Sequence, residues 1–232
     1  MESFLDFLTN TLKINTVKYS VPVIVLFMTG TWSWIFTYVV TIIGIRKYKI
    51  VEIPAIAAAF NLSWEFCWGF LLKSDYGAIF SYFCILWFFM DCYINFHVLK
   101  FGRKLVTHYF IKKYYLIIYV FFLISGCCIT YFIRQTHVDD GVGIISSYFI
   151  CLIIGSSYIY QLLYFSEYRG KGFSYLAAWG KFIGTGMVSI GAFLLYPNNH
   201  FVHTMCIIVF VLDSLYIYLF KHYTNSPIEP IR

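Results

Sequence analysis

The sequence predicts an all-α, polytopic membrane protein: a bundle of seven transmembrane helices with its N-terminus outside and its C-terminus in the cytoplasm. Of the 232 residues, 60% are hydrophobic and only 12% are charged, whereas soluble domains carry roughly 25% charged residues. The mean hydropathy is +0.74. The apolar residues also gather in long runs, and the basic residues gather between them.

Seven apolar runs reach roughly the 20 residues that a helix needs to cross a bilayer. They lie near residues 21–45, 53–72, 77–99, 114–133, 142–165, 173–195 and 200–220. Turn residues separate the last three runs, at Gly170-Lys171-Gly172 and at Tyr196-Pro197-Asn198-Asn199. Because no connection is long enough for a soluble domain, we expect residues 1–232 to form a single transmembrane domain.

The basic residues predict the orientation, because cytoplasmic loops of membrane proteins carry an excess of Lys and Arg. The first, third and fifth connections and the C-terminus hold Arg46, Lys47, Lys49, Lys100, Arg103, Lys104, Lys112, Lys113, Arg169, Lys171, Lys221 and Arg232. The N-terminus and the other connections hold Lys13, Lys18, Lys73 and Arg134. This asymmetry places the C-terminus in the cytoplasm. It also explains the net charge of +6 without nucleic acid as a partner.

The second run contains the strongest candidate for chemistry, Asn61-Leu62-Ser63-Trp64-Glu65. Glu65 is the only charge of its run, and an ionisable residue within a membrane is costly and therefore a functional candidate by default. At helical spacing, Asn61 lies one turn before Glu65 and Trp68 lies about one turn after it. An amide, an acid and an indole therefore share one face. The alternative is that Glu65 pairs with a basic residue of a neighbouring helix and only stabilises packing.

Three further ionisable residues lie inside the runs: Asp91, Lys181 and Asp213. At 1.5 Å per residue, each lies roughly 12 Å from the predicted cytoplasmic end of its helix, and Glu65 about 18–20 Å. This similar depth predicts a shared interior site. A desolvated carboxyl can stay protonated and act as a general acid, while a second carboxylate accepts or relays the proton. Whether Lys181 takes part, or pairs with Asp91 as a purely structural ion pair, stays open at this point.

Polar and aromatic neighbours at helical spacing favour the same site. Asn95 follows Asp91 by one turn, and Gln161 adds an amide from the fifth run. Aromatic faces attract cations, so a pocket lined by aromatic residues would suit a carbocation. Ordinary helix packing is the alternative for any single ring. The aromatic residues in question are Trp64, Trp68, Trp87, Trp179 and Tyr216.

Motifs of several other chemistries are missing from the sequence. There is no DDxxD-type motif for magnesium and diphosphate, and Asp139-Asp140 beside Gly141 is typical of a turn. The seventh run has no lysine midway along it for a retinal Schiff base, and the six histidines show no metal-ligand spacing. We therefore expect neither a metal nor a cofactor.

Four motifs follow one another in an order that resembles a known family. They are Asn61-Leu62-Ser63-Trp64-Glu65, then Trp87 and Asp91 with Lys100-Phe101-Gly102, then Gln161-Leu162-Leu163 with Arg169-Gly170, Ser174, Trp179, Lys181 and Gly184-Thr185, and then Leu212-Asp213-Ser214-Leu215-Tyr216. They are similar to the motifs of the small seven-helix integral-membrane terpene cyclases of fungal and bacterial meroterpenoid and indole-terpenoid biosynthesis. In two respects the chain differs: Lys171 and Gly172 stretch the R-G-x-S spacing by one residue, and Lys181 stands where the family has Arg.

The resemblance implies a non-redox, metal-free terpene cyclase of isomerase or lyase type. A general acid would protonate a terminal epoxide or alkene of a prenyl chain attached to an aromatic, indole or polyketide-derived acceptor. It implies Glu65 and Asp213 as the catalytic acids, in an order that stays open. The supporting or substrate-binding residues would be Asn61, Trp64, Trp68, Trp87, Asp91, Asn95, Gln161, Trp179, Lys181 and Tyr216.

The implied partners are a lipophilic prenylated small molecule and membrane lipid, with a functional link to a prenyltransferase and an epoxidase in secondary metabolism. The membrane would be the bacterial inner membrane or the endoplasmic reticulum. A proton-coupled small-molecule transporter is the main alternative, because acid clusters in membranes also mark proton relays. It would predict inverted repeats with broken helices, and the sequence shows no such symmetry.

Overall fold

The computed structural model describes residues 5–106, 108–139, 141–164 and 173–225. Several residues used in the motif and charge arguments lie outside this part of the chain: Asp140, Arg169, Gly170, Lys171, Gly172 and Arg232. The elements are η1 (Phe7–Thr11), α2 (Val21–Tyr48), α3 (Ala55–Phe66), η2 (Cys67–Leu71), α4 (Ala78–His97), η3 (Val98–Gly102), α5 (Arg103–Leu105), α6 (Tyr109–Lys113), α7 (Tyr115–Gln135), α8 (Ile144–Tyr164), α9 (Tyr175–Leu195) and α10 (His200–Asn225). No strand occurs among the described residues, so the prediction of an all-α protein is confirmed.

Six of the predicted runs form helices that are long and apolar enough to cross a membrane: α2, α4 continued by η3, α7, α8, α9 and α10. This confirms an integral, multi-pass membrane protein. The run near 53–72 forms α3 and η2, which together cover only Ala55–Leu71, or about 25 Å at 1.5 Å per residue. Because this pair is shorter than the other six helices, the count of seven crossings stays a prediction.

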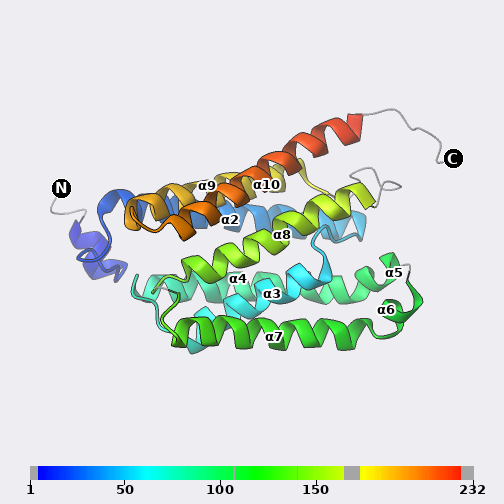
Figure 1. Ribbon diagram of the computed structural model, residues 1–232, viewed down its shortest axis with the longest axis horizontal. Helices are drawn as coiled ribbons and strands as arrows, with labels where there is room; N and C mark the ends of the chain where they lie inside the picture. Colours follow the sequence, from blue (N-terminus) through cyan, green and yellow to red (C-terminus); the bar gives the residue numbers. More distant parts are fainter. Residues whose placement is uncertain (1–4, 107, 140, 165–172, 226–232) are drawn as a thin grey trace.

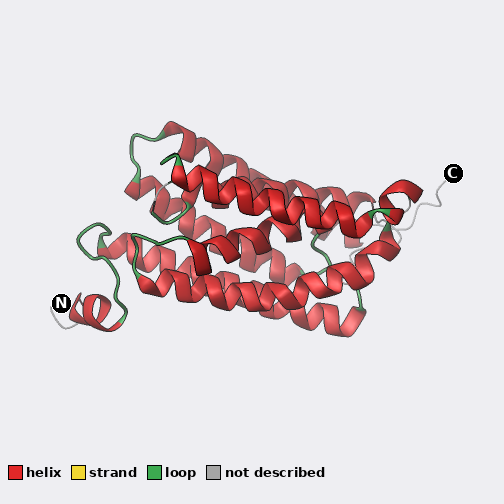
Figure 2. Cartoon of the chain, turned by 90° about the horizontal axis from the view of Figure 1, so that it is seen from below, coloured by secondary structure: helices red, strands yellow, loops and turns green. Residues whose placement is uncertain are grey.

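The long helices run along a common axis in two groups, which Figures 1 and 2 show from perpendicular directions. In one group α9 packs against both α2 and α10, and in the other α3 packs against α7 and α4. The two groups are joined where α8 packs against α10 and α3, and where α2 packs against α4. Interior side chains of α2, α3, α4, α8, α9 and α10 therefore converge on the middle of the bundle.

Glycines allow α2 and α9 to approach closely. A Cβ atom on Gly30 would lie 2.8 Å from the carbonyl oxygen of Gly184, and one on Gly184 would lie 2.8 Å from the indole of Trp34. Small residues at helix contacts are typical of membrane proteins, where close packing holds helices together. The contact places Lys181, one turn before Gly184, with its ammonium 6.0 Å from the centre of the Trp34 ring.

Small residues also allow α3 to pack closely inside the bundle. Ala57, Ala58 and Ala59 are fully buried, and the Ser63 hydroxyl donates a hydrogen bond of 2.7 Å to the carbonyl oxygen of Leu123 on α7. A Cβ atom on Gly126 of α7 would lie 2.8 Å from the same hydroxyl. Because this face is filled by α7, the side chains on the other face of α3 point into the bundle.

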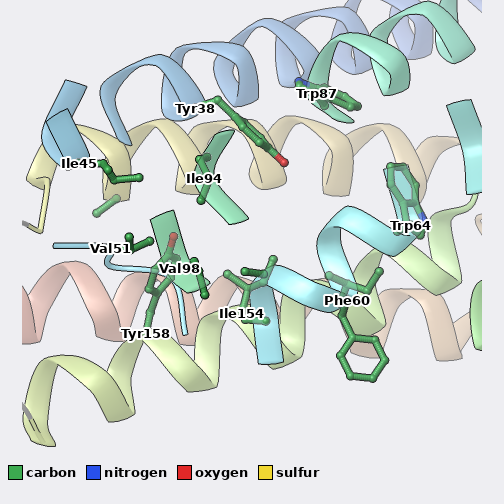
Figure 3. Packing of buried hydrophobic residues seen from close by; sticks show 14 of the residues in the cluster. Tyr38, Ile45, Val51, Phe60, Trp64, Trp87, Ile94, Val98, Ile154 and Tyr158 are labelled. Atoms are coloured by element: carbon green, nitrogen blue, oxygen red, sulfur yellow. The ribbon is translucent and has the colours of Figure 1, made fainter. Parts of the chain in front are cut away.

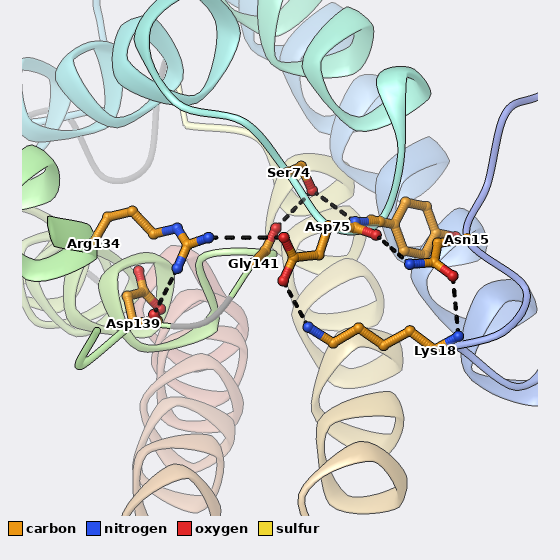
Figure 4. A network of polar contacts seen from close by, with 8 residues as sticks. Asn15, Lys18, Ser74, Asp75, Arg134, Asp139 and Gly141 are labelled. Atoms are coloured by element: carbon orange, nitrogen blue, oxygen red, sulfur yellow. Dashed lines mark hydrogen bonds and ion pairs between the residues drawn. The ribbon is translucent and has the colours of Figure 1, made fainter. Parts of the chain in front are cut away.

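Polar contacts close one end of the bundle (Figure 4). Asp75, in the connection before α4, pairs with Lys18 at 2.7 Å and with Arg134 at 3.8 Å. Its backbone N–H donates to the carbonyl oxygen of Gly141 at 2.9 Å. Exposed pairs of this kind contribute only about 0–1 kcal/mol each. They hold three connections together, at the end opposite to the C-terminal end of α10 (Figure 1). Which end faces the cytoplasm stays a prediction.

Candidate active site

Glu65 is held in the interior by two polar side chains from different helices. It is 2% exposed, and its Oε1 atom accepts a short hydrogen bond from the hydroxyl of Tyr38 on α2. The amide of Asn61, one turn earlier on α3, lies 3.0 Å from the same oxygen. The other oxygen, Oε2, has no hydrogen-bond partner among the described residues. One oxygen is therefore fixed by two partners while the other is available.

The same Asn61 amide joins Glu65 to Asp91 of α4. Its nitrogen lies 2.9 Å from Asp91 Oδ2, and Asp91 is fully buried with its Oδ1 unpartnered among the described residues. No ion pair in the part of the chain that the structure describes involves either acid. We call Tyr38, Asn61, Glu65 and Asp91 the carboxyl cluster. It contains two carboxyl groups and a neutral amide and phenol, and so no cation to balance two negative charges.

The carboxyl cluster borders a cavity with a volume of about 120 Å³. Tyr38, Asn61 and Glu65 are among the lining residues. Figure 3 shows the Tyr38 hydroxyl directed toward the side on which Trp64 and Trp87 lie. Aromatic rings make up much of the remaining wall: Phe27, Trp34, Trp64, Tyr76, Phe80, Phe83, Trp87 and Tyr148. Glu65, which has one oxygen unpartnered among the described residues, thus borders a cavity lined by aromatic rings, and the faces of such rings attract cations.

Trp64 is held in this wall by the start of α8. Its indole N–H donates to the Ser146 hydroxyl at 2.8 Å. The carboxylate of Asp139 in turn accepts hydrogen bonds from the backbone N–H groups of Ile145, at 2.9 Å, and Ser146, at 3.2 Å. Asp139 therefore caps the first turn of α8, where the sequence predicted a turn, and the cap fixes the hydroxyl that positions the indole.

Lys181 pairs with Asp213, through a short contact between its ammonium and Oδ1. Their side chains are 4% and 5% exposed. The interpretation in which Lys181 pairs with Asp91 is therefore wrong, because α9 packs beside α10 and not beside α4. Neither residue of the pair lines the cavity, whereas Thr185 and Cys151 do. Thr185 lies one turn beyond Lys181 and donates to its carbonyl oxygen at 2.9 Å. The pair thus lies behind the wall.

Other residues predicted for the site lie outside the cavity wall. Asn95 turns toward α7, where its Oδ1 accepts a 2.7 Å hydrogen bond from Tyr119. Gln161 donates at 3.1 Å to the carbonyl oxygen of Val51, in the connection between α2 and α3. Trp179 is 40% exposed on the outside of the bundle. Asn95 stays next to Asp91, to whose carbonyl oxygen its amide donates at 2.9 Å, whereas Gln161 and Trp179 lie away from the carboxyl cluster.

The remaining two predicted aromatic residues are buried and do not line the cavity. Trp68 packs against Trp64 and Phe80, with ring centres 6.2 and 5.5 Å away. Tyr216 stacks on Tyr158 of α8 at 5.3 Å. Both belong to the hydrophobic core, where the indole nitrogen of Trp68 and the hydroxyl of Tyr216 have no hydrogen-bond partner among the described residues.

Sequence reasoning missed Tyr38, Trp34 and a further buried acid, Glu52. Tyr38 and Trp34 gave no signal because α2 carries no charge before its last turn. Glu52 lies in the connection between α2 and α3, where its carboxyl accepts hydrogen bonds from the backbone N–H of Ser174 and the hydroxyl of Thr41. Burial raises the pKa of the Glu52 carboxyl from 4.5 to about 7. The position of Glu52, directly beside an apolar run, was the sequence feature that could have identified it.

Comparison with known proteins identifies the family of the chain. No curated protein and no solved structure matches it. A family profile, that of the Pyr4-like transmembrane terpene cyclases, matches residues 12–226. The match covers nearly the whole chain, including every helix that contributes to the cavity. A terpene cyclase is an enzyme, and this family lies in the membrane, as the apolar helices indicate. The chain belongs to the Pyr4-like transmembrane terpene cyclases.

Proposed function

We propose that this protein cyclises a prenyl or epoxyprenyl chain on an aromatic, indole or polyketide-derived acceptor, and that Glu65 donates the initiating proton. The observation that carries the proposal is the placement of Glu65. Among the four ionisable residues considered from the sequence, it alone lines the cavity. Its Oε2 atom has no partner among the described residues, so a proton on this oxygen is free to be transferred to a substrate in the cavity.

The surroundings of Glu65 favour a carboxyl group that holds a proton. Two ionised carboxylates sharing one amide would repel each other strongly in an apolar medium. The Tyr38 hydroxyl and the Asn61 amide both donate to Oε1, which leaves the proton to Oε2. Asp91 shares the Asn61 amide, and we assign it the role of holding that amide in place and exchanging protons with Glu65.

Asp213 has a different proposed role. A carboxylate in contact with a lysine is ionised, so it is poorly suited to donate a proton. Held by Lys181 behind Thr185 and Cys151, it forms a net-neutral ion pair near the wall, and the carboxylate end of this fixed dipole stabilises a cation in the cavity. We therefore propose Glu65 as the donor and Asp213 as the electrostatic partner.

The proposed reaction is balanced without any oxidant or reductant. The Glu65 proton adds to the epoxide oxygen or to an alkene carbon, and the resulting cation is attacked by the next double bond to form a ring. A final deprotonation returns one proton, so substrate and product are isomers. The aromatic wall stabilises the cation, and a cavity inside apolar helices excludes water that would trap it early. A prenyltransferase, and an epoxidase for epoxide substrates, would supply such a substrate.

The test is a cyclisation assay on membranes containing the full chain, with farnesyl- and epoxyfarnesyl-aryl substrates and a chelator present. Glu65→Gln should lower turnover by about 10²- to 10⁴-fold, the usual contribution of a general acid. The matched control is Glu52→Gln, which changes a buried glutamate that lines no part of this cavity and should leave turnover unchanged. Near-normal turnover in Glu65→Gln would remove this residue from the mechanism. Loss of activity on chelation in the wild type would contradict a metal-free reaction.

A further inference from the structure

A second cavity lies at the other end of the bundle from the Lys18–Asp75–Arg134 contacts. Its volume is about 330 Å³, larger than that of the cavity beside Glu65, and the two share no lining residue. It is formed by the start of α3, the start of α7, the end of α8, and η3 with α6. Three of its lining residues are also exposed on the outside of the bundle: Ile56 by 41%, Ile111 by 44% and Tyr160 by 62%. The cavity therefore communicates with the space that lipid occupies around a membrane protein.

Basic residues surround the rim of this cavity. Gly102 and Ile111 line it, and their chain neighbours Arg103 and Lys112 are both exposed. These two neighbours are also in contact, because Arg103 Nε donates to the carbonyl oxygen of Lys112 at 3.1 Å. The same segment carries three more exposed or half-buried cations, Lys100, Lys104 and Lys113.

These five cations have no acidic partner in the part of the chain that the structure describes. The ion pairs found there involve other cations, namely Lys18, Arg134 and Lys181. Glu52, in the connection between α2 and α3, is 4% exposed and directed inward to Ser174 and Thr41. A concentrated positive charge thus stands at the mouth of a largely apolar cavity, and this combination complements a molecule with an anionic head and an apolar tail.

The short helix α6 places this rim at the membrane surface. Tyr109 and Phe110 are 76% and 59% exposed and stand directly before Lys112 and Lys113. Exposed aromatic residues next to lysines are typical of the interface between lipid tails and headgroups. The anionic molecule present in quantity at that depth is a phospholipid, and clusters of basic residues beside transmembrane helices bind anionic lipid headgroups.

We propose that the second cavity binds one acyl chain of an anionic phospholipid, whose headgroup is held by Arg103 and Lys112. This inference is independent of the cyclisation proposed above, since none of the residues given a role in that proposal lines the cavity; of the residues named from the family resemblance, Gln161 alone lines it. The apolar lining receives the chain, and the two cations distinguish an anionic lipid from a zwitterionic one.

The test uses two photoactivatable lipids, a phosphatidylserine and a phosphatidylcholine with the same diazirine-bearing acyl chain. The full chain is reconstituted in phosphatidylcholine nanodiscs with each probe in turn, and labelled peptides are mapped by mass spectrometry. The phosphatidylserine probe should label the peptides of η3, α6 and the start of α7 several times more strongly than the phosphatidylcholine probe. Equal labelling by the two probes would overturn the proposal.

Two pairs of variants separate the roles of charge and cavity. Arg103→Gln with Lys112→Gln should lower labelling by phosphatidylserine about fivefold for each charge removed, whereas Arg46→Gln with Lys47→Gln, at the same end but on α2, should not. Ile118→Trp, which fills the cavity, should lower labelling about tenfold, whereas Ile117→Trp, on the exposed side of α7, should not. If both double charge variants lost labelling equally, the anionic lipid would be attracted by the overall positive charge of this end and not by a specific site. An unchanged Ile118→Trp would show that no acyl chain enters the cavity.

Discussion

The two interior sites that contain buried acids differ in whether a cation neutralises the carboxyl group. Glu65 and Asp91 share the Asn61 amide, the Tyr38 hydroxyl donates to Glu65 alone of the two acids, and no ion pair among the described residues involves either acid. Asp213 is in contact with the ammonium of Lys181. The first site borders the cavity and the second stands behind its wall. A buried carboxyl group is therefore suited to hold a proton at the first site and a negative charge at the second.

This difference shows why two carboxyl groups in one site need not have interchangeable roles. Environment, and not residue type, separates an acid from a permanently ionised carboxylate. Burial in an apolar interior with no cation beside it leaves a carboxyl protonated and available, whereas a lysine in contact removes the proton and fixes the charge.

The largest effect is expected where the ion pair is broken. Lys181→Met leaves Asp213 buried and unpaired, and the loss of one partner of a buried pair costs about 3–5 kcal/mol. The double variant Lys181→Met with Asp213→Leu removes both charges and should recover most of that stability. Thermal unfolding in detergent can be followed with a thiol-reactive dye, because Cys67, Cys84 and Cys206 are free and buried.

Glu65→Gln provides the contrast in the same unfolding assay. It replaces one neutral hydrogen-bonding group by another, so its melting temperature should stay close to that of the wild type while its turnover falls. A Lys181→Met protein that melts like the wild type would contradict the buried ion pair. Equal destabilisation by the single and double variants would do the same.

Glu52 offers a third buried acid whose expected effect depends on pH. Its pKa is raised by burial to about 7 in the folded protein, so the folded state binds a proton more tightly than the unfolded state. Its contribution to stability is fully present below pH 4.5 and is lost as the pH rises through about 7. The size of this change is about 3 kcal/mol.

Glu52→Gln should remove this pH dependence. The measurement is the melting temperature of wild type and variant across this range of pH, each in the same detergent. The wild type should lose stability relative to Glu52→Gln as the pH rises. Parallel curves for the two proteins would show that the Glu52 carboxyl does not bind a proton in the folded state.

A smaller effect is expected from the phenol that orients Glu65. Tyr38→Phe removes one of the two hydrogen bonds to Oε1, and a single such bond is worth about 0.5–1.5 kcal/mol. Turnover should fall about tenfold or less, with little change in substrate affinity. Tyr19→Phe is the matched control, because Tyr19 is buried in the N-terminal segment and lines neither cavity. Equal turnover in Tyr38→Phe and wild type would show that the carboxyl does not depend on this contact.

Much of the fold follows from the sequence because the bilayer requires it. Six apolar runs became helices within a few residues of their predicted ends, since an apolar run of about 20 residues in lipid satisfies its backbone hydrogen bonds within itself as a helix. The motif containing Asn61 and Glu65 identified the acid on the cavity wall for a similar reason, because a carboxyl in an apolar run is conspicuous.

The side-chain contacts that could not be predicted from the sequence depend on which helices become neighbours. The partner of Lys181 is Asp213 because Gly180 and Gly184 set α9 against α2, while α9 also packs beside α10. Nothing in the local pattern around Lys181 distinguishes that partner from Asp91. Tyr38 was missed because an uncharged phenol in an apolar helix resembles an interfacial or packing residue until Glu65 is placed beside it.

The most direct measurement of the central claim is infrared difference spectroscopy of the carbonyl stretch of protonated carboxylic acids. Spectra of the purified wild type, Glu65→Gln and Asp213→Asn are compared near neutral pH, with Lys181→Met and Asp213→Leu together replacing the last variant if it fails to fold. The protonated-acid band of the wild type should lose intensity in Glu65→Gln and should be retained when Asp213 is replaced. A band unaffected by Glu65→Gln, or one lost on replacement of Asp213, would contradict the assignment of Glu65 as the proton donor.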